Sequence, residues 1–383
     1  MMSALAAAPL YVPASAFGAN GRVNYACVAT GGRGRYLMRM FNQQPVQCTA
    51  ICDVYEPHLD EAQKLAPSAK RYGDYRELLA EQKDLDAVVI ASPDHQHFPM
   101  LKEALAAKKD VYLEKPLSKS LEESQQMIKA VRASKQIVQI GMQRRSAPAI
   151  QKAKKLIDDG VLGRITLVKP QWHWNISQKL DNSPLPGKLD WNRFLGAAPK
   201  RALEPMRFRR WRYFWDYAGG NMTDQGTHLM DVVQWFTSSG SPKSALCHGY
   251  VAKMEGAEHP DVFGTIFEFP NFMATWTLDY ANSFQNGWSI TFMGDKGTMI
   301  LDDAGYKVYT EPWKKTSAPA FEEAAPVPVE AHIANFLDCM KSRQEPNCTV
   351  EIAAQAVAGP HLANIALKEG RKALLAQSGK ASD

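Results

Sequence analysis

The sequence predicts an α/β protein with two domains, the first a doubly wound parallel sheet and the second an α/β domain with a largely antiparallel sheet. The chain has 383 residues, whereas a single hydrophobic core stops growing at about 250–300 residues. Between Val23 and Arg145, short apolar runs alternate with amphipathic stretches, as in βαβ units. After Arg164, several strands follow one another directly, and this order favours antiparallel pairing.

In the first domain, residues 23–145, each predicted strand is followed by a predicted helix. Residues 86–91 (DAVVIA) are continuously apolar, as expected for a strand covered on both faces. The helical stretches carry apolar residues on one side only, which is typical of helices packed on a sheet. The predicted strands are 23–30, 46–52, 86–91, 110–113 and 137–140, and the predicted helices are 35–41, 56–65, 99–107 and 121–133.

The second domain, residues 146–383, begins with a predicted crossover helix over 150–159 that stops at Gly160. A long strand (164–174), a polar, proline-rich loop (175–187) and a helix within 220–236 follow. Further strands are predicted at 245–254, 262–269, 274–280, 289–293 and 298–301, with a hairpin turn at residues 295–297. Two helices close the chain, 329–340 and 350–375, the second interrupted at Gly359-Pro360.

Composition excludes several classes of protein. Apolar residues make up 45% and charged residues 22%, which is normal for a globular chain. The 45 lysines and arginines stand against 40 acidic residues, and this weak excess does not predict a nucleic-acid partner. The six cysteines form no CxxC pair and no zinc spacing, so neither a disulfide scaffold nor a metal site is expected. No run of 18 apolar residues predicts a membrane span.

Residues 1–22 have the composition of a leader. Residues 4–10 are small and apolar, and Ala14-Ser15-Ala16 resembles a signal-peptidase site, but the first basic residue is Arg22. We expect either a truncated export signal or a disordered arm. An export signal would place the protein in the periplasm or outside the cell, and a disordered arm leaves a cytoplasmic location open.

The first predicted strand leads into a glycine-rich turn, Ala29-Thr30-Gly31-Gly32-Arg33-Gly34, which is a G-x-G-x-x-G pattern with alanine at its first position. Such glycines let the backbone approach a pyrophosphate at a helix N-terminus. Asp53 follows the next strand, 19 residues after Gly34, where a carboxylate binds ribose hydroxyls and repels a 2′-phosphate. This Rossmann-type pattern predicts NAD rather than NADP. Asp53 could alternatively cap the strand–helix turn, and Ala29 strains the turn slightly.

Three more loops follow predicted strands and form the expected rim of the same site: residues 92–97 (SPDHQH), 114–116 (EKP) and 141–145 (GMQRR). They resemble loops of the glucose–fructose oxidoreductase / inositol dehydrogenase / rhizopine-catabolism (Gfo/Idh/MocA) family, and the resemblance covers nearly all the chain after residue 22. Asp94 stands where that family usually has asparagine. His95 could equally be an ordinary helix-start residue. The resemblance implies cofactor contacts for Ser92, Pro93, His95, His97, Glu114, Lys115 and Gln143.

The same resemblance supplies the catalytic candidates. Lys115 lies between a strand end and a proline, and the family's lysine at this place hydrogen-bonds the substrate hydroxyl and the nicotinamide ribose. Asp224 and His228 are four residues apart, so they share one face of a helix, and their D-x-G-x-H segment resembles the family's catalytic helix. The histidine would be the acid/base, with Asp224 positioning or relaying the proton. A bare Asp–His pair at this spacing could also be a cap or a surface pair.

Substrate contacts are expected from the strand segment 171–174 (QWHW), the arginine-rich segment 206–217 and the loop near the nicotinamide. Alternation along a strand points Trp172 and Trp174 one way and His173 the other. Strand tryptophans can instead belong to the core, and the arginines can instead be solvated or lie in an interface. The candidates are Arg144, Trp172, His173, Arg207, Asp216 and Tyr217.

The sequence therefore favours an NAD-dependent oxidoreductase that acts on a secondary hydroxyl of a sugar, glycoside or cyclic polyol. One alternative is a redox-neutral glycoside-cleaving enzyme of the same superfamily, which oxidises, eliminates and re-reduces on retained NAD. Another, from a different class, is a non-catalytic NAD-sensing protein. The resemblance also implies a sheet with one open face that pairs with another subunit, giving a homodimer or homotetramer.

Overall fold

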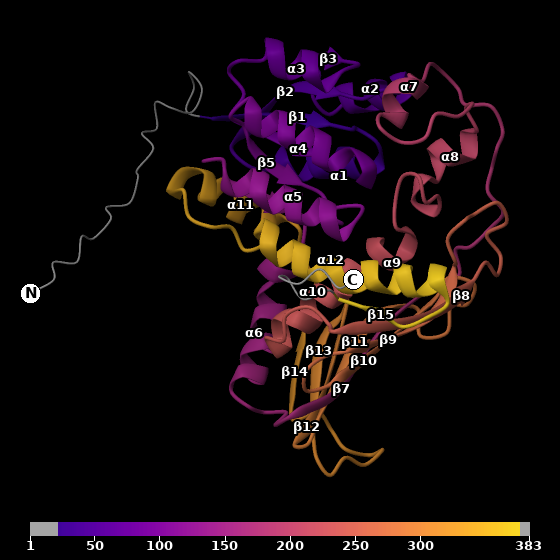
Figure 1. Cartoon of the computed structure of the whole chain (residues 1–383). Helices are drawn as coiled ribbons and strands as arrows, with labels where there is room; N and C mark the ends of the chain where they lie inside the picture. Colours follow the sequence, from indigo (N-terminus) through magenta and orange to yellow (C-terminus); the bar gives the residue numbers. More distant parts are fainter. Residues whose placement is uncertain (1–21, 376–383) are drawn as a thin grey trace, which may run out of the picture.

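The computed structural model describes residues 22–375. Two β-sheets, each with its own helices, lie one above the other and are joined by long helices between them (Figure 1). The segment on which the expectation of an export signal rests falls outside the described residues. No helix within residues 22–375 combines the length and apolar character needed to cross a membrane.

The first sheet is parallel throughout and has the strand order β3-β2-β1-β4-β5-β6, which confirms the doubly wound prediction. Its chain order reverses between β1 and β4, which is the place where such sheets bind ligands. The strands are β1 Val23–Val28, β2 Val46–Cys52, β3 Lys70–Tyr72, β4 Ala87–Ile90, β5 Asp110–Leu113 and β6 Val138–Ile140. The helices are α1 Gly32–Phe41, α2 Glu56–Gln63, α3 Tyr75–Glu81, α4 His97–Ala106 and α5 Leu121–Arg132.

The sequence did not predict β3 and α3. The strand β3 has only three residues, two of them exposed, so it offers no apolar run. The helix α3 is short and is capped by Asp74, whose side chain accepts the Arg76 backbone N–H. Both elements nevertheless matter for the site, because they lie beside the end of β2.

The second sheet has nine strands in the order β14-β13-β12-β11-β7-β10-β9-β8-β15. All neighbours pair antiparallel except β7 and β10, so the prediction of a largely antiparallel sheet is confirmed. The strands are β7 Ile165–His173, β8 Ser244–Tyr250, β9 Val262–Glu268, β10 Met273–Asp279, β11 Gly287–Gly294, β12 Gly297–Asp302, β13 Gly305–Thr310, β14 Phe321–Ala324 and β15 Ala373–Leu374.

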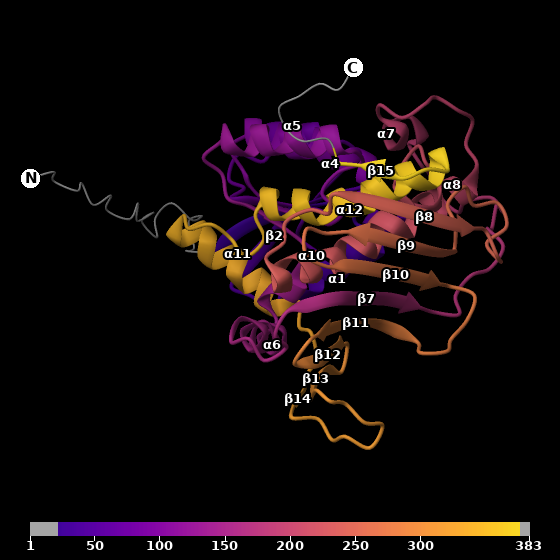
Figure 2. The same ribbon diagram turned by 60° about the horizontal axis from the view of Figure 1, so that its bottom comes forward.

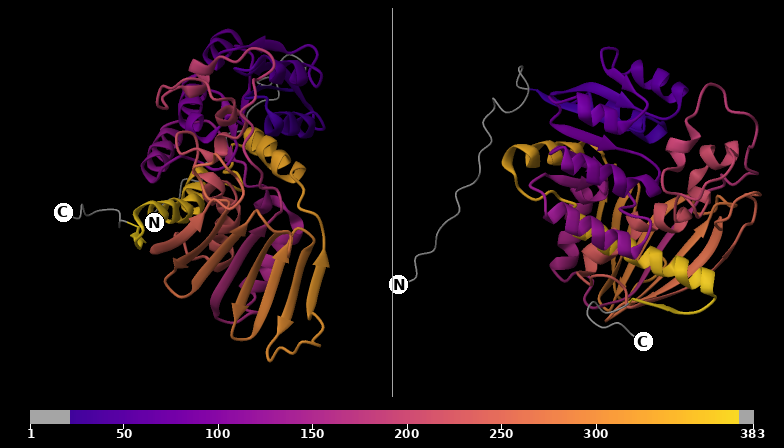
Figure 3. Two further views of the ribbon diagram at one scale, coloured as in Figure 1. Left: turned by 90° about the vertical axis from the view of Figure 1, so that its right-hand side faces the viewer. Right: turned by 45° about the horizontal axis from the view of Figure 1, so that its top comes forward.

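Helices cover one face of this sheet and leave the other uncovered (Figures 2 and 3). Leu246 and Ile266 of this sheet are exposed. The covered face packs against α10 and α12 through a large apolar cluster that includes Trp276 and Phe292. The helices of this half are α6 Pro148–Asp158, α7 Trp191–Leu195, α8 Pro205–Arg209, α9 Gly220–Asp224, α10 Gly226–Thr237, α11 Glu330–Ser342 and α12 Val350–Glu369. The short 3-10 turns within residues 22–375 are η2 Asp94–Gln96, η3 Gln143–Ser146 and η4 Trp211–Tyr213.

The helix α12 joins the two halves of the molecule. Its first turns pack with the first sheet through Val357, and its later turns pack under the second sheet through Leu362. The predicted interruption at Gly359-Pro360 is wrong, because the helix runs unbroken through Pro360. Close packing supports the proline, since a Cβ placed on Gly226 would lie 3.2 Å from its ring. The helix ends earlier than predicted, at Glu369, where Gly370 takes a left-handed φ of 64°.

Residues 176–217, called the strap below, leave the second sheet after β7 and lie against the first domain (Figure 1). Glu56 N–H donates to the Lys188 carbonyl at 3.0 Å, and Asp190 N–H donates to the Val54 carbonyl at 2.8 Å. The strap has its own apolar cluster, which includes Phe194 and Tyr217 and reaches Val54 of the first domain. What the sequence predicted as a polar loop is therefore the beginning of an ordered cover.

Candidate active site

A cavity of about 910 Å³ lies at the carboxyl ends of β1, β2 and β4, where the strand order reverses. The strap closes its other side with residues from α7, α8 and η4. Among the predicted cofactor residues, those that line it are Gly31, Gly32, Arg33, Asp53, Ser92 and Pro93.

The turn between β1 and α1 has the geometry that a dinucleotide requires. Ala29 takes a left-handed φ of 66°, which confirms the strain expected at this position. A Cβ on Gly34 would lie 2.1 Å from the Ala29 carbonyl oxygen, so the helix can pack on the turn only with glycine there. The N-terminus of α1 has no side-chain cap and no acidic residue in its first turn. Its backbone N–H groups therefore remain able to bind a pyrophosphate, and the residues present fit NAD.

Asp53 lines the cavity and also caps the turn after β2, so the capping interpretation is confirmed and ribose binding stays a prediction. Its Oδ2 accepts the Thr30 N–H at 2.7 Å, and its Oδ1 accepts the Tyr55 N–H at 2.9 Å. These bonds fix a carboxylate at the end of β2, where it has acceptor capacity left for hydroxyl groups. A fixed negative charge at this place disfavours a 2′-phosphate, which supports NAD over NADP.

Three predicted cofactor residues hold the rim in position through contacts within the protein. The buried ring of His97 lies 2.8 Å from the Pro116 carbonyl and 3.0 Å from the Ser92 carbonyl, which ties the loops after β4 and β5 together. His95 instead turns to the strap, where its Nε2 lies 2.8 Å from the Phe194 carbonyl. Glu114 accepts Arg33 Nε at 2.7 Å. Burial lowers the pKa of His95 to about 4, and it lowers the pKa of His97 as well.

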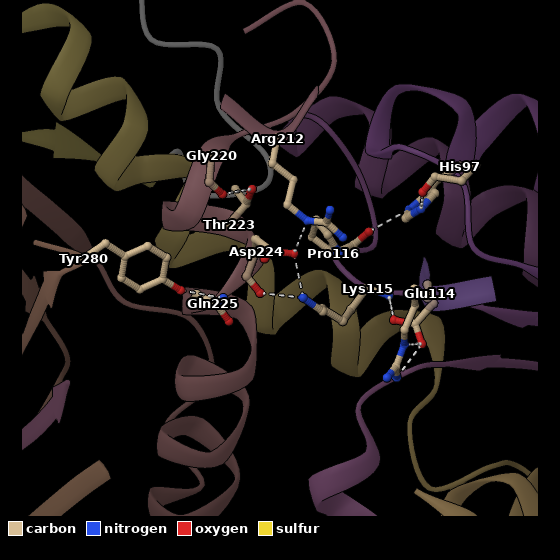
Figure 4. Close-up of polar contacts among 12 residues, drawn as sticks. His97, Glu114, Lys115, Pro116, Arg212, Gly220, Thr223, Asp224, Gln225 and Tyr280 are labelled. Atoms are coloured by element: carbon tan, nitrogen blue, oxygen red, sulfur yellow. Dashed lines mark hydrogen bonds and ion pairs between the residues drawn. The ribbon is translucent and has the colours of Figure 1, made fainter. Parts of the chain in front are cut away.

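The Lys115 ammonium bridges the two halves of the molecule (Figure 4). Its Nζ donates to Asp224 Oδ1 at 2.7 Å and to the Asp224 carbonyl at 2.9 Å. The carboxylate also accepts Arg212 Nε at 3.2 Å. Burial by itself would raise the pKa of Asp224, but Lys115 and Arg212 together hold that pKa below its usual range. Asp224 is therefore an anion whose charge is used to fix Lys115.

Asp224 and His228 belong to two helices, and this corrects the prediction of one continuous helix. Helix α9 ends at Asp224 and α10 begins at Gly226, because the His228 N–H donates to the Gln225 carbonyl at 3.1 Å. The carbonyl of Asp224 is thereby left for the Lys115 ammonium. Gln225, at the junction, donates from Nε2 to the Tyr280 hydroxyl at 2.7 Å (Figure 4).

His228 is buried on the first turn of α10, and its Nδ1 has no hydrogen-bond partner among the described residues. Burial lowers the pKa of His228 well below its ordinary value, and the positive charges of Lys115 and Arg144 add to this effect. The ring is therefore neutral at neutral pH. A neutral imidazole can accept a proton, which is what the predicted acid/base role requires.

The loop after β6 brings Arg144 to the same region. Its guanidinium carbon lies 3.6 Å from the centre of the Trp288 ring and 5.3 Å from that of Trp172. Burial lowers the pKa of Arg144 to about 9. The adjacent Gln143 has a buried Oε1 without a partner among the described residues. Arg144 is thus near enough to His228 to affect its pKa, and Trp172 packs on Arg144, whereas substrate contacts of these residues stay predictions.

Four of the predicted substrate residues lie elsewhere. His173 points to the opposite face of the second sheet from Trp172, where its Nε2 lies 3.4 Å from the Thr277 hydroxyl. Arg207 is held by Glu204 and Glu258 at 2.9 and 2.7 Å. Asp216 pairs with Arg201 at 2.5 Å, and Tyr217 is buried in the cluster of the strap. The structure therefore gives these side chains packing or ion-pairing contacts, and it does not bring them to the cavity.

Two residues of the site were missed. Arg212 belongs to the run of four arginines that the sequence analysis noted, and it alone of the four contacts Asp224. Asp94 was noted only for its unusual identity, yet it is buried beside the charges of Asp224, Arg212 and Lys115. The sequence thus marked the arginine-rich segment and the unusual aspartate. Nothing in the sequence, however, indicated which arginine faces α9.

Family models match most of the described chain. The model of an oxidoreductase family with an NAD-binding Rossmann fold matches residues 23–142, and the model of the GFO/IDH/MocA C-terminal domain matches residues 150–300. The chain is 26% identical over 272 residues to the uncharacterized oxidoreductase YrbE of Bacillus subtilis, which covers 69% of this chain and 63% of that protein. It is 34% identical over 145 residues to inositol 2-dehydrogenase of Salmonella typhimurium, which covers 37% of this chain and 43% of that protein. The matches thus span less than two thirds of these relatives.

Solved structures share the fold. Levoglucosan dehydrogenase in complex with NADH and levoglucosan superposes with a TM-score of 0.75 at 17% identity, covering 93% of this chain and 100% of that one. The WlbA dehydrogenase from Bordetella pertussis, in complex with NADH and UDP-GlcNAcA, gives a TM-score of 0.72 at 20% identity with the same coverage. From the two family models, which together match more than half of its length, the chain belongs to the Gfo/Idh/MocA oxidoreductase family and carries that family's NAD-binding Rossmann domain.

Proposed function

We propose that this protein oxidises a secondary hydroxyl of a sugar, glycoside or cyclic polyol with NAD. The observation that carries the proposal is the contact of Lys115, from the nucleotide half, with Asp224, next to the neutral ring of His228. A fixed cation and a neutral base at one place are the two groups needed to remove a hydroxyl proton and stabilise the oxygen left behind. The named dehydrogenases among the relatives support this class of substrate.

Each side chain then has one role. NAD, when bound, supplies the acceptor for the hydride that leaves the substrate carbon. His228 accepts the hydroxyl proton, and the Lys115 ammonium stabilises the negative charge that develops on the oxygen. Asp224 keeps Lys115 in place through two contacts, and Arg212 holds Asp224 from the other side. Arg144 and Trp172 offer a guanidinium and an aromatic edge to the rest of the ligand.

A second candidate is the redox-neutral cleavage of a glycoside, and the strap favours it. The hydroxyl of Tyr55 donates to the Pro186 carbonyl, and Arg193 Nε lies 3.4 Å from Asp74 Oδ2, and both contacts join the strap to the first domain beside the cavity. A cover fixed in this way slows the exchange of a bound nucleotide. Retained NAD suits a cycle in which the hydride returns to the same molecule after elimination.

One experiment separates these functions. The nucleotide is released from purified protein by acid and identified by mass spectrometry, and the loaded protein is then mixed with glycosides, free sugars and inositols. Net formation of reduced nicotinamide supports the dehydrogenase. Release of the aglycone without net reduction supports the cleaving enzyme. Bound NAD with neither reaction across the panel contradicts both and leaves the NAD-sensing protein.

We further propose that the open face of the second sheet binds a second copy of the chain. Leu246, Ile266 and Met273 lie exposed on one face of the neighbouring strands β8, β9 and β10. Apolar side chains aligned across three strands are typical of an interface. Light scattering should give a homodimer or homotetramer, and Ile266→Lys should shift it toward monomer; a monomeric wild type would contradict this assignment.

Export to the periplasm is likewise proposed, on the composition of residues 4–16 alone. Fractionation of the native organism tests it, and protein confined to the cytosolic fraction would contradict it.

A further inference from the structure

We propose that Asp94 is a positioning residue that stores a proton beside the Lys115–Asp224–Arg212 cluster and thereby sets the net charge around the reacting oxygen. The effect on turnover rests on the proposed function, whereas the stored proton itself does not. The inference concerns this chain's own residue, because an asparagine at the same place could not titrate.

The backbone on both sides of Asp94 is fixed. Asp94 begins η2, and its residue surface is only 2% exposed. The next three side chains hold two segments: His95 and Gln96 both contact the strap at Phe194, and His97 contacts the loops after β4 and β5. These contacts hold the backbone on either side of Asp94, so its carboxyl is kept in a buried place.

Four charged groups, from four different parts of the chain, are near enough to Asp94 to interact with its charge. They are Asp224 on α9, Arg212 on η4, Lys115 after β5 and Lys119 before α5. Lys115 and Arg212 both bind Asp224, at 2.7 and 3.2 Å. Lys119 Nζ donates to the Asp216 carbonyl at 2.6 Å. Within residues 22–375, no ion pair of 4.0 Å or less reaches Asp94.

The two carboxyl groups therefore have opposite environments. Burial raises the pKa of Asp94 to about 8, and the negative charge of Asp224 adds to the rise. The pKa of Asp224 lies below its usual range, because Lys115 and Arg212 offset the effect of burial. Two carboxyls whose pKa values are pushed apart divide the roles of proton holder and anion. At neutral pH, Asp94 is the acid and Asp224 the anion.

The stored proton decides the charge of the cluster. With Asp94 protonated, Lys115, Arg212 and Asp224 leave one net positive charge, which favours an oxyanion at the substrate. When pH rises, Asp94 releases its proton to water and the net charge falls to zero. Lys115 then stabilises the oxyanion less well, so activity should decline on the alkaline side.

Infrared spectroscopy tests the proton without substrate. In protein labelled with ¹³C-aspartate, the carbonyl stretch of a protonated carboxyl should be present at pH 7, vanish as the pH rises past about 8, and be missing in Asp94→Asn. If Asp94→Asn fails to fold, the labelled wild type is compared with labelled Asp231→Asn, because burial also raises the pKa of Asp231, and a titrating band that persists in Asp231→Asn supports Asp94. A wild type without a protonated aspartate band that titrates in this range would overturn the proposal.

The pH dependence of kcat/KM tests the consequence. The ratio of Asp94→Asn to wild-type kcat/KM should rise about tenfold from pH 7 to pH 9, because only the wild type carries the group that titrates near 8. Asp86→Asn, the same change at a partly buried aspartate in the turn before β4, is the matched control and should leave the wild-type profile intact. Parallel profiles for wild type and Asp94→Asn would overturn the role in turnover. A protein with the infrared band but no carbohydrate activity would contradict the proposed function alone.

Discussion

The rim of the cofactor cavity and the strap that covers it are held in different ways. The rim consists of strand ends in one parallel sheet, and Gly34, His97 and the Arg33–Glu114 pair lock its loops from within. The strap shares a single β-bridge with the first domain, Tyr55 with Leu189, and otherwise depends on side-chain and loop contacts. Segments held by few contacts open at a lower free energy than a sheet does. The rim should therefore determine which nucleotide is bound. The strap should determine how slowly that nucleotide dissociates.

The largest effect is expected from Lys115→Ala, which removes the cation where the two halves of the molecule meet. Turnover should fall about a thousandfold, because the oxyanion loses its fixed charge. The affinity for NADH should change little, since Lys115 does not line the nucleotide cavity. Steady-state kinetics and a fluorescence titration with NADH measure the two quantities, and near-normal turnover would contradict the role of Lys115.

A smaller effect is expected from undocking the strap. In Tyr55→Ala/Arg193→Ala, two contacts between the strap and the first domain are lost, and NADH should dissociate about 10–100-fold faster. Stopped-flow displacement measures the rate. Lys188→Ala is the control, because its exposed side chain lies 3.8 Å from Glu56 and contributes little. Equal dissociation rates in the wild type, the double variant and Lys188→Ala would show that the strap does not retain the nucleotide.

The smallest effect concerns strain in the rim. Ala29→Gly should stabilise the protein by about 0.5–1 kcal/mol, because relief of the left-handed φ exceeds the entropy that glycine loses on folding. Ala130→Gly, inside α5, should instead destabilise it by about 1 kcal/mol. Denaturant unfolding followed by circular dichroism gives both values. A destabilised Ala29→Gly would show that the turn is not strained.

The two regions also differ in how far the sequence predicted them. The glycine turn and Asp53 were found because their spacing follows from local backbone geometry, a strand leading directly into a helix. Only the first part of the strap was predicted, as a polar loop over residues 175–187, because its docking depends on Asp74 and Tyr55, more than 100 residues away in the chain. Alternation correctly separated Trp172 from His173, but it could not show which of the two faces of the sheet looks toward the cofactor.

The sequence predicted the catalytic pair, Lys115 and Asp224, less directly than the glycine turn but better than the strap. Lys115 and Asp224 are 109 residues apart, and only the resemblance to a family brought them together before the structure did. The break between α9 and α10 could not be predicted, because it arises where the Asp224 carbonyl accepts a lysine from the other half of the molecule. Choosing Arg207 rather than Arg212 failed for a similar reason, since four arginines in one segment look alike until their partners are known.

The most direct test of the central claim is a single-turnover experiment on His228→Ala and wild type, each loaded with NAD and mixed with a glycoside that the wild type converts. We expect the absorbance of reduced nicotinamide to appear within one turnover in the wild type, whether it then persists or decays. In His228→Ala the same signal should form about a thousandfold more slowly at equal occupancy, because no other neutral base is placed to take the hydroxyl proton. Equal rates in the two proteins, or conversion of the glycoside without any reduced nicotinamide, would contradict the account.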